Sequence, residues 1–510
     1  MPRTLRMEEV EEETRAVGQR LLSLALRSSP RLLDPETAAG RLVAATADDP
    51  GAKTALFRFV DLYPSLRSPA EVRRHAVEYF PNGLPGLGGV AGDVAGLART
   101  LSESIEELAR GFLLGRDPTE ALPALSDLHA AGLGFTVDFL GEATLGGQEA
   151  DAYRDRYLDL LEVISPEAAR WPRHPAVDAG HPEPAPRCNV SLKLSALEPH
   201  LPPQDPCGAV ERLGARLLPI LRSARRVGAS VHLDLEQWEL HGIALDVFEA
   251  MADHPEFRDW PHLGITLQSY LRESRADLHR LLGLARRRRT PLGVRLVKGA
   301  YWDAEVVRAR QFGYPCPVFT EKARTDASYE ALSLAVLRNH RWLRGAFAGH
   351  NLRSLGHVAA CAKLLGLPQE AVEFQVLHGL ADPERDALRT LGFRVREYTP
   401  VGQAVPGMAY LVRRLLEITS TDGFLRLAHG GTAEPGALLS RPGSRRGRRR
   451  PAAALLSPET SFRNTGHTDF VRAADRRAFA LAVERVGREL PLRAPVVVDG
   501  KELSGAPVLT

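Results

Sequence analysis

Cysteine and methionine are scarce in this chain of 510 residues, and long hydrophobic runs are missing. The four cysteines, at positions 188, 207, 316 and 361, include no Cys-x-x-Cys pair, which argues against a disulfide framework and fits a reducing cytoplasm. No stretch of about 18 apolar residues could span a bilayer, and the acidic N-terminus is unlike a signal peptide. These absences predict a soluble, intracellular, globular protein.

A strong excess of either charge is also missing, because the net charge is only +3. Near balance gives no general attraction to nucleic acid. The basic run 286–289 ends a predicted helix, where cations complement the helix dipole, and the run 440–451 reads as a flexible basic linker. No recognisable DNA-binding fold lies beside either run, so we expect no DNA binding.

Helical periodicity dominates the first 130 residues. Apolar residues recur at helical spacing in four segments, namely Glu8–Leu26, Thr54–Tyr63, Pro69–Phe80 and Leu97–Leu114. Ser68-Pro69 has the form of a helix start. This region is predicted to be entirely helical.

From residue 134 the pattern changes to short apolar runs that alternate with helix-length intervals. Eight runs read as strands: Phe135–Leu140, Val190–Leu194, Ser230–Leu235, Gly264–Leu267, Gly293–Val297, Ala346–Ala348, Val372–Leu377 and Phe393–Glu397. Eight such repeats predict an α/β fold, a (β/α)8 TIM-like barrel. An open doubly wound sheet is the alternative, but the glycine-rich first turn of that fold is missing.

The predicted strands end in polar residues. These residues are Glu142, Lys193, Asp234, Glu236, Gln268, Arg295, Lys298, His350, Asn351, His378 and Tyr398. Catalytic residues of such barrels come from the C-terminal ends of the strands, so the set as a whole favours a shared site. Any one of these residues alone would be interpreted as structural.

The stretch Arg295–Trp302 follows a short apolar run and reads as a buried strand that ends in charge. Two cations there are costly unless an anion meets them. Gly299 lets the backbone turn closely, and Tyr301 and Trp302 offer flat surfaces for stacking. The stretch suits a planar anion such as a flavin or nucleotide; the alternative is a strand end capped by solvated charges.

A helix predicted after the last strand carries Tyr410, Arg413, Arg414 and Glu417 at helical spacing on one side. Paired guanidinium groups bind a carboxylate through directional, bidentate hydrogen bonds. The helix therefore favours a carboxylate clamp, with a solvated surface face as the alternative.

Several segments together resemble the proline dehydrogenase domain of proline utilization A, in order from about residue 50 to residue 425: Ser191–Ala196, Arg295–Trp302, Phe347–Asn351, Phe374–Gly379, Tyr398–Gly402 and Ala409–Glu417. The segment from Phe462 to Lys501 resembles the entry into the aldehyde dehydrogenase domain, whose remainder is not encoded, so we expect a fragment or half of a split pair. The turn after Glu417 departs from the family pattern, and Gly349 stands where many members carry Thr. The implied domains are a helical arm (1–130), the barrel (131–430), a basic linker (431–455) and a partial entry segment (456–510).

The resemblance implies FAD, held without a covalent bond. Arg295 would lie near flavin N5, Lys298 near the pyrophosphate or ribityl chain, and Trp302 near the adenine with Tyr301 beside it. Further contacts would come from Asp234, Gln268, Gly299, Thr320, Lys322, His350, Gln375, Arg414 and Glu417.

The resemblance also implies L-proline as substrate. Arg413 and Arg414 would take its carboxylate, and Glu142 would pair with the first of them to close the site. Tyr398, Tyr410 and Leu377 would pack on the ring, and Lys193 and Asp234 would complete a polar wall.

The implied reaction is hydride transfer from proline to flavin N5, which gives Δ1-pyrroline-5-carboxylate, with electrons passed to a membrane quinone. The expected location is cytoplasmic, with transient peripheral contact at the inner face of the plasma membrane, and no metal is expected. The alternatives are a folate-linked flavin reductase on the same barrel type and a proline-sensing or nucleic-acid-binding regulator.

Overall fold

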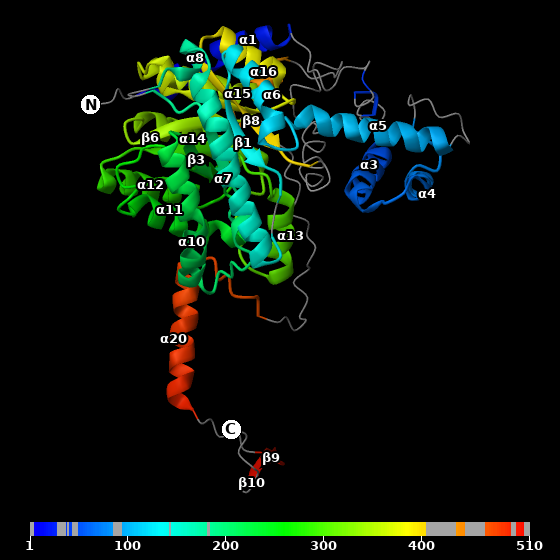
Figure 1. Cartoon of the computed structure of the whole chain (residues 1–510). Helices are drawn as coiled ribbons and strands as arrows, with labels where there is room; N and C mark the ends of the chain where they lie inside the picture. Colours follow the sequence, from blue (N-terminus) through cyan, green and yellow to red (C-terminus); the bar gives the residue numbers. More distant parts are fainter. Residues whose placement is uncertain are drawn as a thin grey trace.

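The computed structural model describes residues 5–27, 37, 40–42, 49–84, 94–141, 144–180, 184–403, 435–443, 465–490 and 496–503. Eight parallel strands close into a barrel in the order of the chain, with β1 paired to both β2 and β8 (Figure 1). The strands are β1 (Gly134–Phe139), β2 (Asn189–Leu192), β3 (Ser230–Leu233), β4 (Leu263–Gln268), β5 (Leu292–Val297), β6 (Leu343–Ala348), β7 (Glu373–Leu377) and β8 (Arg394–Val401).

This barrel confirms the predicted fold class; most strand boundaries lie within two residues of the prediction, and two differ by three or more. β6 begins at Leu343 rather than Ala346, and β8 continues to Val401 rather than ending at Glu397. Pro400 lacks an N–H group and reads as a strand breaker. Its carbonyl nevertheless accepts a hydrogen bond from Leu114 N at 3.0 Å, and the strand runs on beside β1. Tyr398 therefore lies inside β8 and not at its end.

Helices surround the barrel and bury the outward-facing Leu, Val and Phe residues of the strands (Figure 1). The longer ones are α6 (Pro118–Ala130), α7 (Gly147–Arg170), α10 (Pro206–Arg226), α11 (Trp238–Asp253), α12 (Ser274–Arg288), α13 (Trp302–Phe312), α14 (Lys322–Arg338), α15 (Leu352–Leu364) and α16 (Asp382–Thr390). Short turns complete the covering, namely α8 (Pro175–Asp178), α9 (Leu194–Leu197), η3 (Gln369–Ala371) and α19 (Pro435–Leu438).

The region before the barrel is helical, as predicted, and its helices are α1 (Met7–Ala25), α3 (Pro50–Leu62), η2 (Tyr63–Ser65), α4 (Pro69–Tyr79) and α5 (Val94–Phe112). Ser68 caps α4 by accepting a hydrogen bond from Glu71 N, and Asp49 caps α3 in the same way. Helices α3, α4 and α5 share a hydrophobic core of their own around Phe59. That core reaches the barrel mouth through Phe112, Leu140 and Leu380.

Helix α1 packs apart from the other N-terminal helices, against α15 and α16 on the outside of the barrel (Figure 1). Gly356 of α15 lies so close to α1 that a β-carbon there would stand 3.1 Å from Gly18 N. Arg353, buried at the start of α15, pairs with Glu11 of α1 at 2.8 Å and with Glu330 of α14 at 2.8 Å. The N-terminal helix is thus held by close backbone packing and by a shared buried arginine.

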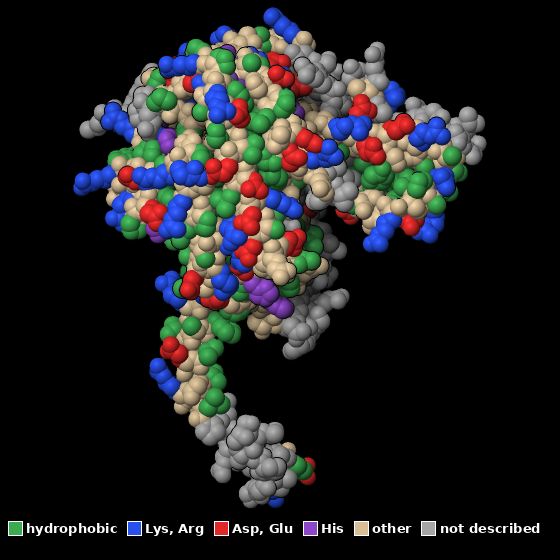
Figure 2. Space-filling view, in the orientation of Figure 1, with side chains coloured by type: hydrophobic (Ala, Val, Ile, Leu, Met, Phe, Trp, Pro, Cys, Tyr) green, Lys and Arg blue, Asp and Glu red, His purple; other side chains and the backbone are tan. Residues whose placement is uncertain are grey.

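After the barrel, the segment 465–472 lies against α11 and α13. Trp238 Nε1 donates to Asp469 at 3.1 Å, and Arg472 pairs with Glu273 at 3.1 Å. Helix α20 (Ala473–Glu489) then leads away from the barrel, and the hairpin of β9 (Val496–Val498) and β10 (Lys501–Leu503) follows. Apolar side chains of α20 are exposed, among them Phe479 and Val483 (Figure 2). No helix among the described residues is long and apolar enough to cross a membrane.

The inside of the barrel is polar, unlike the usual filling of branched apolar residues. Glu373 on β7 accepts hydrogen bonds from Arg396 at 2.8 Å and from Gln375 at 2.7 Å. Burial disfavours the charged form of Glu373, but Arg396 and Arg394 outweigh it and hold the pKa of Glu373 far below its ordinary value. A hydrogen-bonded column therefore runs up the interior from Glu373 towards the C-terminal ends of the strands.

Glu384 in the first turn of α16 is a buried carboxyl whose Oε2 has no hydrogen-bond partner in the described residues. Burial, with a contribution from Asp382, raises the pKa of Glu384 from 4.5 to about 8. Between these values the folded chain holds a proton that the unfolded chain has released, so stability falls as the pH rises through this window. Glu384→Gln is expected to raise the free energy of unfolding at pH 8 by about 2–4 kcal/mol, with little effect at pH 5.

Urea unfolding of both proteins at the two pH values measures this difference. Glu370→Gln, at an exposed position of η3, is the control. An equal change at both pH values would contradict the role given to the buried carboxyl.

Candidate active site

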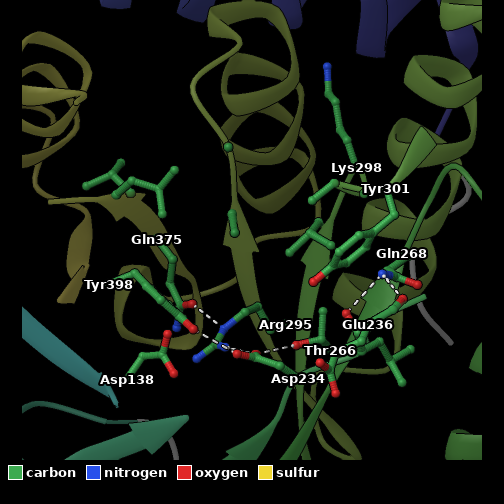
Figure 3. A pocket seen from close by; sticks show the side chains of 18 of the residues that line it. Asp138, Asp234, Glu236, Thr266, Gln268, Arg295, Lys298, Tyr301, Gln375 and Tyr398 are labelled. Carbon is green, nitrogen blue, oxygen red and sulfur yellow. Dashed lines mark hydrogen bonds and ion pairs between the residues drawn. The ribbon is translucent and has the colours of Figure 1, made fainter. Parts of the chain in front are cut away.

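A pocket of about 370 Å³ opens at the C-terminal mouth of the barrel (Figure 3). It brings together side chains from all eight strands or the loops that follow them: Asp138, Lys193, Asp234, Glu236, Gln268, Arg295, Lys298, His350, Gln375 and Tyr398. Except for Asp138, all of these come from the sets predicted from the sequence. Because the strands are parallel, residues far apart in the chain meet at this end.

Arg295 is the centre of the pocket floor and is almost completely buried. Its Nη1 donates to Asp234 Oδ1 at 2.6 Å and to Ser191 Oγ at 2.7 Å. Its Nε donates to Gln375 Oε1 at 2.7 Å, and this bond links it to the interior column. Arg295 lies within β5, two residues before its end, and its guanidinium is fixed by partners on three other strands or loops.

Tyr398 closes one side of this network. Its hydroxyl donates to Asp234 Oδ2 at 2.8 Å, and the Arg295 guanidinium lies 5.3 Å from the centre of its ring. Burial and the nearby carboxylates of Asp138 and Asp234 raise the pKa of Tyr398 well above its ordinary value, so the hydroxyl stays a donor. Burial opposes ionisation of Asp234, but Arg295 and Lys193 outweigh it and lower the pKa of Asp234.

Lys193 and Asp138 form a second ion pair on the floor, with Nζ 2.5 Å from Oδ2. Asp138 was not among the residues predicted from the sequence, although it is one of the residues around the pocket. The signal was the alternation in β1, where Phe135, Val137 and Phe139 pack on the helices. Thr136 and Asp138 then face the interior, and a charge there demands a partner.

The walls are arranged by loop contacts. Gln268 Nε2 donates to the carbonyls of Leu235 and Glu236, and Glu236 accepts from Ser195 Oγ at 2.5 Å. His350 Nε2 accepts from Leu377 N at 3.2 Å, which sets that apolar side chain at the rim. His378, predicted at the same rim, instead lies 2.5 Å from Glu397 Oε2 and does not line the pocket.

A cationic cluster extends from the pocket towards α14. Lys298 pairs with Asp326, which also accepts a hydrogen bond from Lys322 at 3.1 Å, and Figure 3 shows Lys298 directed away from Arg295. Burial lowers the pKa of Lys298, and Asp326 offsets this only in part. Asp326 is a further residue that sequence reasoning missed, because a contact between residues this far apart leaves no local pattern.

The predicted stacking residues lie beside this cluster. Tyr301 lines the pocket, whereas Trp302 lies outside it with 39% of its surface exposed and with Nε1 bonded to Phe319 O at 2.8 Å. Thr320 is exposed next to Phe319. Gly299 has a φ of 128°, and a β-carbon there would stand 2.5 Å from the Tyr270 ring, so the close turn requires glycine.

The residues present fit a flavin nucleotide. Arg295 Nη2 is buried without a hydrogen-bond partner in the described part of the chain, so a donor is left for an electron-rich ring. Lys298 and Lys322 share one carboxylate and therefore carry a net positive charge suited to phosphate. Gly349 has a φ of 152° with nothing within 4 Å of its β position, which leaves open space at the pocket wall.

Five predicted site residues lie outside the described residues, namely Glu142, Tyr410, Arg413, Arg414 and Glu417. The carboxylate clamp and its closing glutamate therefore remain sequence predictions. Among the described residues, no group of three or more His, Cys, Asp or Glu side chains could hold a metal ion.

Comparison with protein families gives two matches. The family model described as Proline dehydrogenase matches residues 121–427, which include every strand of the barrel. The Proline utilization A N-terminal domain matches residues 11–112, which include α3, α4, α5 and all but the first turn of α1.

Curated relatives include the Bifunctional protein PutA of Klebsiella aerogenes, 32% identical over 65% of this chain and 25% of the relative. Proline dehydrogenase 2 of Bacillus subtilis is 27% identical over 62% of this chain and 89% of the relative. The chain thus spans about a quarter of the bifunctional relatives that it matches.

Solved structures give the same result. Proline utilization A from Bdellovibrio bacteriovorus, inactivated by N-propargylglycine, superposes with a TM-score of 0.88 at 35% identity, over 99% of this chain and 51% of that one. A Bradyrhizobium japonicum proline utilization A mutant gives a TM-score of 0.72 at 25% identity, over 95% and 51% of the two chains. The family model covers more than half of the sequence, and the chain therefore belongs to the proline dehydrogenase family, as the proline dehydrogenase region of a proline utilization A.

Proposed function

We propose that this chain oxidises L-proline to Δ1-pyrroline-5-carboxylate with FAD as its cofactor. The observation that carries the proposal is the Arg295 network at the barrel mouth, where a buried guanidinium keeps one donor without a partner in the described residues. The network lies inside the stretch matched by the family. When bound, FAD supplies the acceptor for the hydride that leaves the ring carbon beside the proline nitrogen.

The chain's own residues bind and orient the reactants. Arg295, held by Asp234, Ser191 and Gln375, places a fixed positive charge at the floor, where it stabilises negative charge that arrives on an electron-accepting ring. Lys298 and Lys322 bind the diphosphate, with Trp302 and Tyr301 against the rings of the cofactor.

The substrate is held by charge at one end and by apolar contact along its ring. Tyr398 and Leu377 offer apolar surface in the pocket. Arg413 and Arg414 take the carboxylate, Tyr410 packs beside the ring, and Glu142 closes the site by pairing with Arg413. Lys193 and Asp234 complete the polar wall. The amine must lose its proton before hydride can leave.

Electrons then pass to a membrane quinone, which requires transient peripheral contact between a cytoplasmic protein and the inner face of the plasma membrane. Residues 1–130 act as a helical arm and cap, 131–430 as the FAD-binding barrel and 431–455 as a basic linker. Residues 456–510 form the entry to an aldehyde dehydrogenase domain or chain that takes the product. The exposed apolar face of α20 supports such a neighbour, because an isolated amphipathic helix has little stability until its apolar face packs against another element.

The test is spectroscopic. The purified chain is expected to be yellow, with a flavin absorbance spectrum that bleaches on anaerobic addition of L-proline and returns with an artificial acceptor. A colourless protein after reconstitution with FAD, or a flavin that proline leaves oxidised, would sink the proposal.

A further inference from the structure

The ion pair of Asp138 and Lys193 is the most deeply buried charge pair at the pocket. The Asp138 side chain is 0% exposed, whereas the Lys193 side chain is 10% exposed, and their atoms lie 2.5 Å apart. Asp138 is in β1, and Lys193 directly follows β2. The lysine is therefore the more open partner, and the aspartate lies behind it.

A buried carboxylate such as that of Asp138 requires a compensating positive charge. An unpaired carboxylate inside a barrel is strongly disfavoured, and removing one partner of a buried pair leaves the other charge uncompensated. The floor contains two cations, Lys193 and Arg295, and two carboxylates, Asp138 and Asp234, so it is formally neutral. Asp234 forms an ion pair with Arg295 at 2.6 Å, and Asp138 forms an ion pair with Lys193.

An ammonium group has three donors, and the bond to Asp138 uses one of them. Within the described residues the other two have no hydrogen-bond partner, so they can bind whatever enters the pocket that Lys193 lines. Burial alone would lower the pKa of Lys193, but Asp138 and Asp234 outweigh it and raise that pKa above its ordinary value. Around Lys193, the titratable and charged groups in the described residues are Asp138 on β1, Tyr153 on α7, Asp234 and Glu236 after β3, Arg295 on β5 and Tyr398 on β8.

We propose that Asp138 is a positioning residue, which holds the ammonium of Lys193 at the pocket floor and so sets the affinity for the anionic substrate without touching it. The proposal rests on the proposed function, because it takes an amino acid with a free carboxylate as the ligand. Asp138 acts on the substrate through its ion-pair partner Lys193, so its removal weakens binding in proportion to the charge that Lys193 loses.

The experiment compares the full chain with Asp138→Asn and Asp138→Glu in proline oxidation from pH 6 to pH 10. Asp138→Asn is expected to raise KM about 10-fold to 100-fold, with kcat changed by less than about threefold. Without the aspartate, only Asp234 offsets burial and the pKa of Lys193 falls, so kcat/KM of the variant relative to that of the wild type should decrease at alkaline pH. Asp138→Glu keeps the charge but moves it by one methylene group, so it should raise KM by a smaller factor than Asp138→Asn.

Asp178→Asn is the matched control. Asp178 is also a buried carboxylate in an ion pair, with Arg187 at 2.8 Å, but it lies on α8 and does not line this pocket. It is expected to lower thermal stability and to leave KM and the pH profile unchanged.

A second readout needs no catalysis. Amine acylation with acetic anhydride, located by peptide mass spectrometry, is expected to label Lys193 at lower pH in Asp138→Asn than in the wild type. A wild type that binds flavin but does not oxidise proline would refute the proposed function, and the labelling would still report on the pair.

Unchanged KM and pH profile in a folded, flavin-loaded Asp138→Asn would overturn the proposal. So would an equal loss of activity in Asp138→Asn and Asp178→Asn, which indicates a purely structural pair. If Asp138→Asn does not fold, Asp138→Glu decides: a KM that rises while kcat holds supports positioning, and wild-type KM with wild-type labelling contradicts it.

Discussion

Replacement of Arg295 by methionine is expected to slow the reduction of bound flavin by proline about 100-fold to 1,000-fold, because one preorganised electrostatic partner contributes this much elsewhere. The guanidinium is fixed by Asp234, Ser191 and Gln375, so it does not have to reorganise when charge develops near it. Since the effect falls on the reduced state, the flavin reduction potential should also become more negative. Stopped-flow absorbance gives the rate, and an equilibrium titration gives the potential.

Trp302→Ala is the comparison for this variant. Trp302 is at the start of α13, outside the pocket, and 39% exposed, so its loss removes stacking surface and not charge. It should lose FAD on dialysis while the reduction rate per bound flavin changes little. Arg295→Met with wild-type rate and potential, or Trp302→Ala with full FAD, would show that β5 and its following turn do not form the flavin platform.

Arg413→Met and Arg414→Met are each expected to lower kcat/KM for proline about 30-fold to 1,000-fold, which corresponds to about 2–4 kcal/mol. The reason is the loss of a charge-assisted pair with the substrate carboxylate, so most of the change should appear in KM. Steady-state kinetics with an artificial acceptor measure it. Arg414→Met is also expected to lose part of its flavin, because Arg414 is predicted to contact FAD as well.

The control is Arg287→Met, which removes an exposed arginine of α12 that lies 3.6 Å from Asp253. Its kinetics should match the wild type. If both clamp variants oxidise proline with wild-type kinetics, Arg413 and Arg414 do not bind the carboxylate. Lys193 and Arg295 would then be the cations of the site.

Much of the fold could be predicted because its signals are local. Each strand is a short apolar run, and each helix shows its own periodicity, as Ser68 at the start of α4 illustrates. The end of β8 was missed because Pro400 looks like a breaker, whereas here the proline only leaves one donor out of the ladder. The sequence around Pro400 does not reveal whether the pairing with the neighbouring strand tolerates the missing N–H donor.

The site was predictable where one residue carries its own signal. Arg295 and Lys298 stand out because charge at the end of a buried strand needs a partner. Asp138 was hidden inside an apolar run, and its meaning depends on Lys193, which is 55 residues away. Asp326, on α14, likewise gains its role through Lys298, which follows β5. Contacts of this kind are set by how strands and helices pack in the barrel, not by spacing in the sequence.

The way Arg353 is held has a practical consequence for anyone shortening this protein. A truncation that starts at β1 would remove Glu11 and leave a buried guanidinium against Glu330 and the Leu439 carbonyl alone. It would also expose to solvent the surface at Gly356 against which α1 packs, and the apolar side chains that contact Leu21 and Ala25. The barrel's apparent first residue is therefore not a safe cut site. Truncations should retain α1, for example by deleting the helices α3 to α5 internally, if a minimal folded unit is wanted.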